Sequence, residues 1–278
     1  MAVGQYEGRG RRGTNPLIDI FDAGTWTVQN LPRGHAELSA VSCTSTTSCV
    51  AVGAESNGDA LVATLAGTTW TESSLRAPKQ SLWLDGVTCQ TAATCVAVGA
   101  ALGSLTPDGP LETPVVATLD NGSWAMETLP LPSDNLNYSG VENPSLQSVW
   151  CQSIHSCVAV GSYISSFGDR ETPLIEMLAN GRWIEVSPDE SDGGFLAGVS
   201  CVAKGSCVAV GATAEATPVI DTLSGGNWEP SPVSVPGGDS GMVLQSVSCP
   251  DRSSTCMAVG QEANPAGVNP VVATIGVS

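Results

Sequence analysis

Residues 38–53 read Leu-Ser-Ala-Val-Ser-Cys-Thr-Ser-Thr-Thr-Ser-Cys-Val-Ala-Val-Gly, and most of the fold can be inferred from this sequence. A similar stretch occurs at four further places, always with a second cysteine followed by Val-Ala-Val-Gly or Met-Ala-Val-Gly. The runs beside the cysteine pair are short and rich in β-branched residues, which is typical of strands. We therefore expect a two-stranded hairpin with the cysteines next to its turn. The five stretches are 38–53, 84–99, 146–161, 196–211 and 244–260.

Two further strands are expected after each hairpin. The third strand is an apolar run usually led by proline, such as Pro114–Leu119, and the fourth opens at a Gly turn followed by tryptophan, as in Gly122–Trp124. Four short strands per repeat, with glycine and an aromatic residue at fixed positions, are typical of a β-propeller blade. The sequence therefore predicts an all-β chain, a β-propeller of four-stranded antiparallel blades. A stacked β-solenoid is the alternative, although its repeats are normally shorter.

The repeats cover the chain as a single β-propeller domain, residues 1–278. Met1-Ala2-Val3-Gly4 matches Met257–Gly260, so the first unit lacks its first strand, and the last unit stops before a Gly-x-Trp turn. Six blades is the simplest arrangement, with five blades or part of a seven-bladed ring as alternatives. The expected units are approximately 1–35, 36–80, 81–133, 144–190, 194–236 and 242–278.

The ten cysteines form five regular pairs with none left over, which predicts one hairpin disulfide in each complete repeat. Disulfides persist outside the reducing cytoplasm, so we expect an extracellular or cell-surface protein. Structural zinc is the rival reading, but it usually needs shorter cysteine spacings or histidines. The expected bridges are Cys43–Cys49, Cys89–Cys95, Cys151–Cys157, Cys201–Cys207 and Cys249–Cys256.

The beginning of the chain conflicts with export, because residues 1–13 carry no apolar signal-peptide core. Since Met1 falls in the middle of a repeat, we expect the chain to be a fragment whose signal peptide and first cysteine hairpin lie upstream.

Composition narrows the classes of partner. Ten basic residues against 27 acidic ones give a net charge of −17, which disfavours nucleic acid and anionic membrane surfaces. No segment is apolar enough to insert into a membrane. We expect a monomer, or a part of a larger surface protein, whose ligand is a glycan or a protein.

The repeat unit resembles two known kinds of propeller. The cysteine pair, together with the Pro114–Trp124 segment, resembles cysteine-stapled propeller repeats of secreted actinobacterial proteins. The turn Thr118–Trp124 resembles the Asp-box of sialidase-like (BNR) propellers, although it is one residue shorter and only Asp22 and Asp120 keep the acid. Asp-boxes are structural turns, so this resemblance implies a fold and no activity.

Strand direction places the loops after the second and fourth strands on one face, opposite the cysteine turns. These loops vary in length and carry scarce aromatic residues beside carboxylates and amides, which is the lining expected for a sugar or peptide. The candidate binding residues are Tyr6, Trp83, Asn137, Tyr138, Tyr163, Phe167, Asp169 and Glu171.

We therefore expect an extracellular, non-enzymatic binding module for a cell-surface glycan or protein, acting through this loop face. The alternative is a carbohydrate-active hydrolase or lyase of the sialidase-like type, using paired loop carboxylates such as Asp169 with Glu171. No catalytic residues are assigned, because the eight arginines are scattered and His35 and His155 are the only histidines. No cofactor or metal site is expected, with calcium at Glu55, Asn57 and Asp59 as the one candidate.

Overall fold

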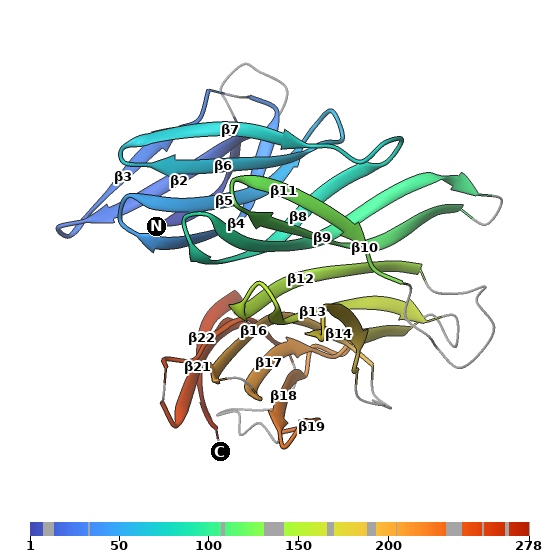
Figure 1. Cartoon of the computed structure of the whole chain (residues 1–278). Helices are drawn as coiled ribbons and strands as arrows, with labels where there is room; N and C mark the ends of the chain where they lie inside the picture. The colour runs from blue at the N-terminus through green and yellow to red at the C-terminus, as the bar shows by residue number, and fades with distance from the viewer. Residues whose placement is uncertain are drawn as a thin grey trace. The chain divides into compact units, whose positions relative to one another are not determined.

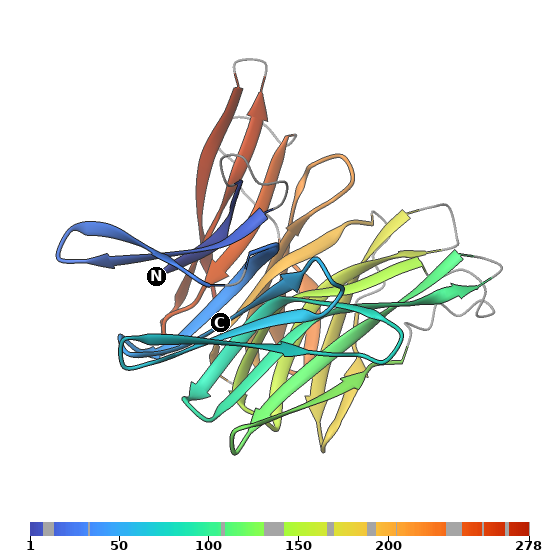
Figure 2. The same cartoon turned by 90° about the horizontal axis from the view of Figure 1, so that it is seen from above.

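The computed structural model describes residues 1–7, 14–32, 34–106, 109–130, 142–165, 170–187, 193–203, 205–231, 241–251, 253–264 and 267–277. This part of the chain is all-β and folds as a six-bladed propeller whose blades are antiparallel sheets of three or four strands (Figure 1). The blades fall into two compact units, Met1–Leu129 and Pro130–Ser278. Figure 2 shows the same strands from above. Within the described ranges no helix is long and apolar enough to cross a membrane.

The first unit contains blades 1, 2 and 3. Blade 1 consists of β1 (Ala2–Glu7), β2 (Thr14–Asp22) and β3 (Thr25–Asn30). Blade 2 consists of β4 (Ala36–Ser45), β5 (Ser48–Glu55), β6 (Ala60–Ala66) and β7 (Thr69–Leu75). Blade 3 consists of β8 (Ser81–Thr91), β9 (Thr94–Thr106), β10 (Gly109–Asp120) and β11 (Ser123–Thr128).

The second unit contains blades 4, 5 and 6. Blade 4 consists of β12 (Glu142–Ser153), β13 (Ser156–Ser165), β14 (Arg170–Ala179) and β15 (Arg182–Glu185). Blade 5 consists of β16 (Phe195–Ala203), β17 (Ser206–Ala212), β18 (Pro218–Ser224) and β19 (Asn227–Pro230). Blade 6 consists of β20 (Met242–Ser248), β21 (Thr255–Asn264) and β22 (Gly267–Gly276).

The predicted order of four strands is confirmed in blades 2 to 5, where each strand pairs with the next along the chain. Blade 1 has the strands that match the second, third and fourth positions of the repeat, and blade 6 has those that match the first, second and third. The predicted six-bladed arrangement is therefore confirmed.

The turns between third and fourth strands fix the register of these hairpins. Asn121 and Gly122 form a two-residue turn with φ values of 49° and 81°, between the paired residues Asp120 and Ser123. Positive φ at both turn positions matches the twist of the flanking strands, and glycine adopts it without strain. The Gly-x-Trp signal in the sequence therefore marks a tight hairpin.

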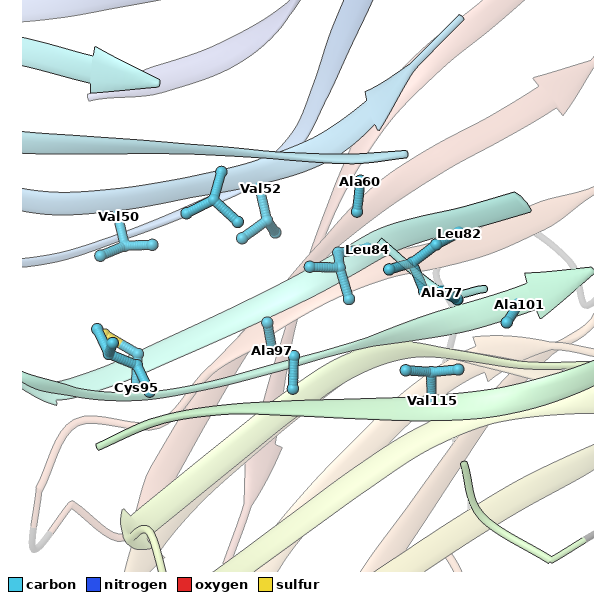
Figure 3. Packing of buried hydrophobic residues seen from close by; sticks show 13 residues of the cluster. Val50, Val52, Ala60, Ala77, Leu82, Leu84, Cys95, Ala97, Ala101 and Val115 are labelled. Atoms are coloured by element: carbon cyan, nitrogen blue, oxygen red, sulfur yellow. The ribbon is translucent and has the colours of Figure 1, made fainter. Parts of the chain in front are cut away.

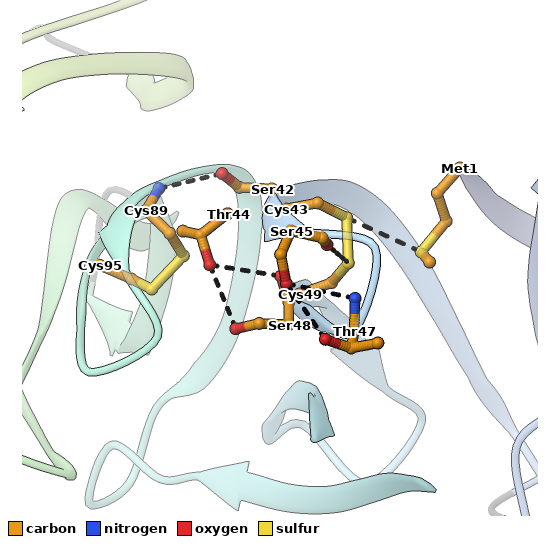
Figure 4. The surroundings of a disulfide bond; sticks show 10 residues. All are labelled: Met1, Ser42, Cys43, Thr44, Ser45, Thr47, Ser48, Cys49, Cys89 and Cys95. Atoms are coloured by element: carbon orange, nitrogen blue, oxygen red, sulfur yellow. Dashed lines mark hydrogen bonds between the residues drawn. A yellow bond between two sulfur atoms is a disulfide. The ribbon is translucent and has the colours of Figure 1, made fainter. Parts of the chain in front are cut away.

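All five predicted disulfides are present, with Cα atoms 3.9 to 4.3 Å apart. In blades 2 to 5 the two cysteines stand directly opposite each other in the ladder, as Cys43 and Cys49 do. Each bridge therefore holds the register of the hairpin formed by the first and second strands. Figure 4 shows the bridges of blades 2 and 3.

Serine hydroxyls link the cysteine turns of successive blades. The backbone N–H of Cys89 in blade 3 donates to Ser42 Oγ in blade 2 at 2.9 Å (Figure 4). The backbone N–H of Cys249 in blade 6 donates to Ser200 Oγ in blade 5 at 3.0 Å. In blades 2 and 5 the serine before the first cysteine therefore holds the hairpin of the following blade.

A β-bulge in the first strand explains the glycine that ends Val-Ala-Val-Gly. The register of β4 against β5 shifts between Leu38 and Ala40, so the backbone of β4 folds over Gly53. A Cβ on Gly53 would overlap the Glu37 carbonyl oxygen and lie 2.8 Å from Leu38 Cα. The same bulge and the same overlap occur at Gly99, Gly161, Gly211 and Gly260.

The core lies between neighbouring blades of a unit. Between blades 2 and 3, Val50 and Val52 of β5 pack with Leu82 and Leu84 of β8 (Figure 3). In blades 2 to 5 the second strands are buried on both faces, as the apolar run of β5 predicts. In blade 6 the positions that match Val50 and Val52 are exposed, and they hold Met257 and Val259.

Candidate functional site

A cavity of about 290 Å³ lies between blades 5 and 6 in the second unit. It is at the end of these blades that carries the cysteine turns, because Cys207 forms part of its wall. We call it the Ser206 pocket. Its lining residues are Ser206, Cys207, Thr222, Leu223, Ser224, Ser231, Gly276 and Val277.

The walls of the Ser206 pocket continue the core between blades 5 and 6. Val208 and Ile220 of blade 5 are buried in that core against blade 6. Thr222 stands opposite Val208 in the ladder and two residues beyond Ile220, so its side chain follows theirs on the same face of the sheet. The apolar interface therefore ends in a row of hydroxyl groups.

Hydroxyl groups dominate the chemistry of the Ser206 pocket. Each serine or threonine hydroxyl can donate one hydrogen bond and accept others. Thr222 Oγ1 contacts the Glu229 carbonyl oxygen only at 3.4 Å, a weak interaction that a ligand could replace. None of the described lining residues is charged, so the pocket fits a neutral ligand that has both donors and acceptors.

Sequence reasoning missed this pocket, although a signal was present. A serine or threonine precedes the second cysteine in every repeat, and Ser206 is that residue in blade 5. In blade 5 this residue occurs together with Thr222 and with a serine at position 224. Blade 2 has Ala66 and blade 4 has Ala179 at the position that matches Ser224, so they lack this third hydroxyl group.

Of the predicted binding residues in the second unit, the structure describes Tyr163 and Glu171. Tyr163 and Glu171 both belong to the hairpin of β13 and β14. Ser162 Oγ donates to Glu171 Oε1 at 2.8 Å, and Tyr163 is only 7% exposed. These side chains therefore support the hairpin. Asn137, Tyr138, Phe167 and Asp169 lie outside the described residues.

The two predicted binding residues of the first unit are on different blades. Tyr6 is on β1, where it stands opposite Asn15, and its ring is exposed. Trp83 is on β8 of blade 3, where its side chain is hydrogen-bonded to the carboxylate of Asp85. The structure brings no predicted aromatic residue of this unit beside another.

Asp85 is the residue added by the bulge of β8, since the register shifts between Leu84 and Gly86. Burial, and after it the nearby charge of Glu37, raise the pKa of Asp85 to about 6, although the hydrogen bond from Trp83 acts in the opposite direction. Asp85 is therefore a carboxyl group that titrates well above the usual range.

The candidate calcium residues are paired with one another and with their neighbours. Asn57 Nδ2 donates to Glu55 Oε2 at 3.0 Å and to Asp59 Oδ2 at 3.2 Å. Arg76 Nε forms an ion pair with Asp59 Oδ2 at 2.9 Å, and Ser74 Oγ donates to Glu55 Oε1 at 2.7 Å. Within the described ranges no group of three or more His, Cys, Asp and Glu side chains could hold a metal ion.

Glu176 on β14 is, after Asp85, a second carboxyl group with a raised pKa that the sequence analysis did not predict. It is 1% exposed, and burial together with the charge of Glu185 raises its pKa to about 8. Glu185 stands directly opposite it on β15. The signal in the sequence was an acid in the middle of an apolar strand, where Ala63 and Ala117 occupy the matching positions of blades 2 and 3.

The chain matches no protein family model and no curated protein. Among solved structures it is similar to AofleA from Arthrobotrys oligospora, with a TM-score of 0.54 at 12% identity over 96% of this chain and 80% of that one. It is also similar to the SapL1 lectin in complex with α-methyl fucoside, with a TM-score of 0.53 at 12% identity over 95% and 88%. The Aleuria aurantia lectin, a six-bladed β-propeller with a novel fucose recognition mode, has a TM-score of 0.53 at 10% identity over 88% and 78%. These likenesses show the propeller fold.

Proposed function

We propose that this protein is an extracellular, non-enzymatic binding module for a neutral saccharide, and that the Ser206 pocket is its binding site. The observation that carries the proposal is the uncharged, hydroxyl-lined cavity between blades 5 and 6. The two lectins of the same fold, one in complex with α-methyl fucoside and one with a described mode of fucose recognition, make a saccharide the first ligand to test.

The composition of the wall favours a sugar over other small ligands. Sugars present alternating hydroxyl groups and C–H patches, and the pocket offers the hydroxyl groups of Thr222 and Ser224 beside the apolar side chain of Val277. A cavity of about 290 Å³ is close to the lower limit for small-molecule sites, which suits a monosaccharide or the end of a chain. With a net charge of −17, the protein repels anionic sugars such as uronates.

The same residues favour binding without turnover. Glycoside hydrolysis needs a general acid and a second carboxylate on opposite sides of the bond. The described lining residues include neither a carboxylate nor a histidine. The five disulfides support an extracellular location.

Calorimetric titration with neutral monosaccharides, beginning with α-methyl fucoside, tests the proposal. Thr222→Val and Ser224→Ala remove two hydroxyl groups with little change of shape, and each lost hydrogen bond is worth about 1 kcal/mol. The double variant should therefore bind about 30-fold more weakly than the parent. Thr64→Val is the matched control, because Thr64 occupies the position of Thr222 in blade 2.

The results separate this pocket from the predicted loop face. If the double variant binds a sugar as well as the parent does, the Ser206 pocket is not the site. Loss of binding in Trp83→Ala instead would place the site on the loop face. Release of 4-nitrophenol from neutral aryl glycosides would support the alternative of a hydrolase.

A further inference from the structure

The chain contains three Asn-Gly pairs, at residues 57–58, 121–122 and 180–181. In such a pair the glycine nitrogen can attack the side-chain carbonyl carbon of the asparagine, because glycine has no side chain that obstructs the approach. Ammonia then leaves, and a cyclic imide, the succinimide, remains in the backbone. All three asparagines are exposed, so the contacts and the conformation around each pair decide which of them reacts.

At Asn57 hydrogen bonds hold both of the groups that would have to react. Its side-chain nitrogen donates to the carboxylates of Glu55 and Asp59, and its Oδ1 accepts from the Asp59 N–H at 2.9 Å. The attacking nitrogen is also occupied, because the Gly58 N–H donates to the Glu55 carbonyl oxygen at 3.0 Å. Ring closure would break several hydrogen bonds at once, so we expect this pair to be protected.

The pair at Asn180 lacks such contacts. Asn180 and Gly181 are the two turn residues between β14 and β15, with φ values of 53° and 75°, and they separate the paired residues Ala179 and Arg182. Within the part of the chain that the structure describes, no hydrogen bond holds the Asn180 side chain or the Gly181 N–H. The imide ring needs a different backbone conformation from this turn, so the hairpin must open locally before the ring can close.

The hairpin at Asn180 should open more easily than the similar one at Asn121 in blade 3. β15 covers only four residues, whereas β11, which follows Asn121, covers six. Ile184 in β15 is 50% exposed, so little burial of apolar surface holds this strand in place. A short strand with few buried contacts belongs to the parts of a fold that open at low cost.

The charges beside the two turns act in the same direction. The attacking glycine nitrogen must lose its proton, so a neighbouring positive charge favours the reaction and a negative charge opposes it. Arg182 directly follows Gly181, whereas Asp120 directly precedes Asn121. The length of the ladder and the local charge therefore both make Asn180 the most reactive of the three asparagines.

We propose that Asn180 is a site of spontaneous modification, where the Asn180-Gly181 turn converts to isoaspartate through a succinimide. The bond between the Gly181 nitrogen and Asn180 Cγ forms, and the bond from Cγ to the side-chain nitrogen breaks, so ammonia leaves. Water then adds to the main-chain carbonyl carbon of the imide, and the bond from this carbon to the Gly181 nitrogen breaks. The main chain now runs through Cβ and Cγ, and the former main-chain carbonyl group becomes a free carboxylate.

The modified turn cannot keep the register of the hairpin. Isoaspartate adds a methylene group to the main chain between Ala179 and Arg182, which pair directly in the unmodified protein. Trp183 on β15 stands opposite Leu178 in the same ladder. We therefore expect the outer strand of blade 4 to detach when Asn180 is modified, and the fluorescence of Trp183 to change with it.

Incubation of the full chain in mildly alkaline buffer tests the proposal, with isoaspartate located by proteolysis and mass spectrometry. In the folded protein Asn180 should be modified at least about tenfold faster than Asn57, with Asn121 between them. Asn57 is the internal control, because it is also exposed and is also followed by glycine. In concentrated urea the contacts are lost, so all three pairs should react within about threefold of one another.

Asn180→Gly is the matched variant, because it gives blade 4 the Gly-Gly turn that blade 5 has at Gly225 and Gly226. It should keep the circular dichroism of the parent, form no isoaspartate at this turn and show no slow change of fluorescence.

Three results would overturn the proposal. They are the absence of isoaspartate at Asn180, equal rates at Asn180 and Asn57 in the folded protein, and the same ratio of these rates in urea. An equal change of fluorescence in Asn180→Gly would contradict the detachment of β15. None of these results depends on saccharide binding.

Discussion

The carbonyl oxygen of Glu37 occupies the space in which Gly53 would carry a Cβ. This relationship recurs in each blade that has a first strand, so the glycine of Val-Ala-Val-Gly is fixed by packing against the backbone of the neighbouring strand. Backbone atoms move less easily than the end of a side chain. The structure of the hairpin therefore depends on this glycine as well as on the disulfide.

Gly53→Ala should lower the stability of the protein by about 3 kcal/mol or more, because the bulge of β4 must move to accept the methyl group. Gly4→Ala, at the matching position of blade 1, should change stability by less than about 0.5 kcal/mol, because a Cβ there meets no atom within 4 Å. Urea denaturation followed by tryptophan fluorescence measures both. Equal losses in the two variants would contradict the role of the bulge.

Removal of the bridge in blade 5 by the pair Cys201→Ser and Cys207→Ser should cost about 2 kcal/mol, since it closes a short loop. The loss should appear as a lower denaturation midpoint under oxidising conditions. Under a strong reductant the parent should approach the variant. A parent whose midpoint is unchanged by complete reduction, checked by thiol titration, would show that the bridges add nothing to stability.

Glu176→Gln should stabilise the protein at pH 8 more than at pH 5. The pKa of Glu176 is raised from 4.5 to about 8 in the folded chain, so the native state binds this proton more tightly than the unfolded state does. Stability is then lost as the pH rises from about 4.5 to about 8, and a neutral glutamine avoids that loss. Melting temperatures of parent and variant across this range measure the difference. A constant difference between them would rule out titration of Glu176.

Chelators should leave the melting temperature unchanged, because the carboxylates of Glu55 and Asp59 are already paired with Asn57, Ser74 and Arg76. Arg76→Ala should have only a small effect, since its side chain is 75% exposed and exposed ion pairs contribute little. Differential scanning fluorimetry with EDTA and with added calcium tests this. A rise in melting temperature with calcium that is abolished in Asp59→Asn would reveal a cation site.

The repeat made most of the fold predictable from the sequence. Each hairpin and its disulfide are local, so the cysteine pair and Val-Ala-Val-Gly contain the information for both strands. The bulge was not predicted, because the reason for Gly53 lies in a carbonyl group of another strand. The repeated glycine could have suggested a close backbone approach.

The candidate site was less predictable than the fold. The Ser206 pocket combines Thr222 and Ser224 of one blade with Gly276 and Val277 of the next, and no local pattern connects them. Tyr163 was predicted as a loop residue that contacts ligand, but the structure places it in the buried part of a strand, since β13 extends to Ser165. The loop-face residues outside the described ranges stay predictions.

The hydrogen bond from Cys89 N–H to Ser42 Oγ has a consequence for the order of folding. The acceptor belongs to the blade that leaves the ribosome first, and the donor to the turn of the blade that follows it. The same direction holds for Ser200 and Cys249. In both pairs the earlier blade therefore presents a polar anchor at the turn that the disulfide of the next blade must close, so synthesis from the N-terminus places the acceptor before its donor emerges.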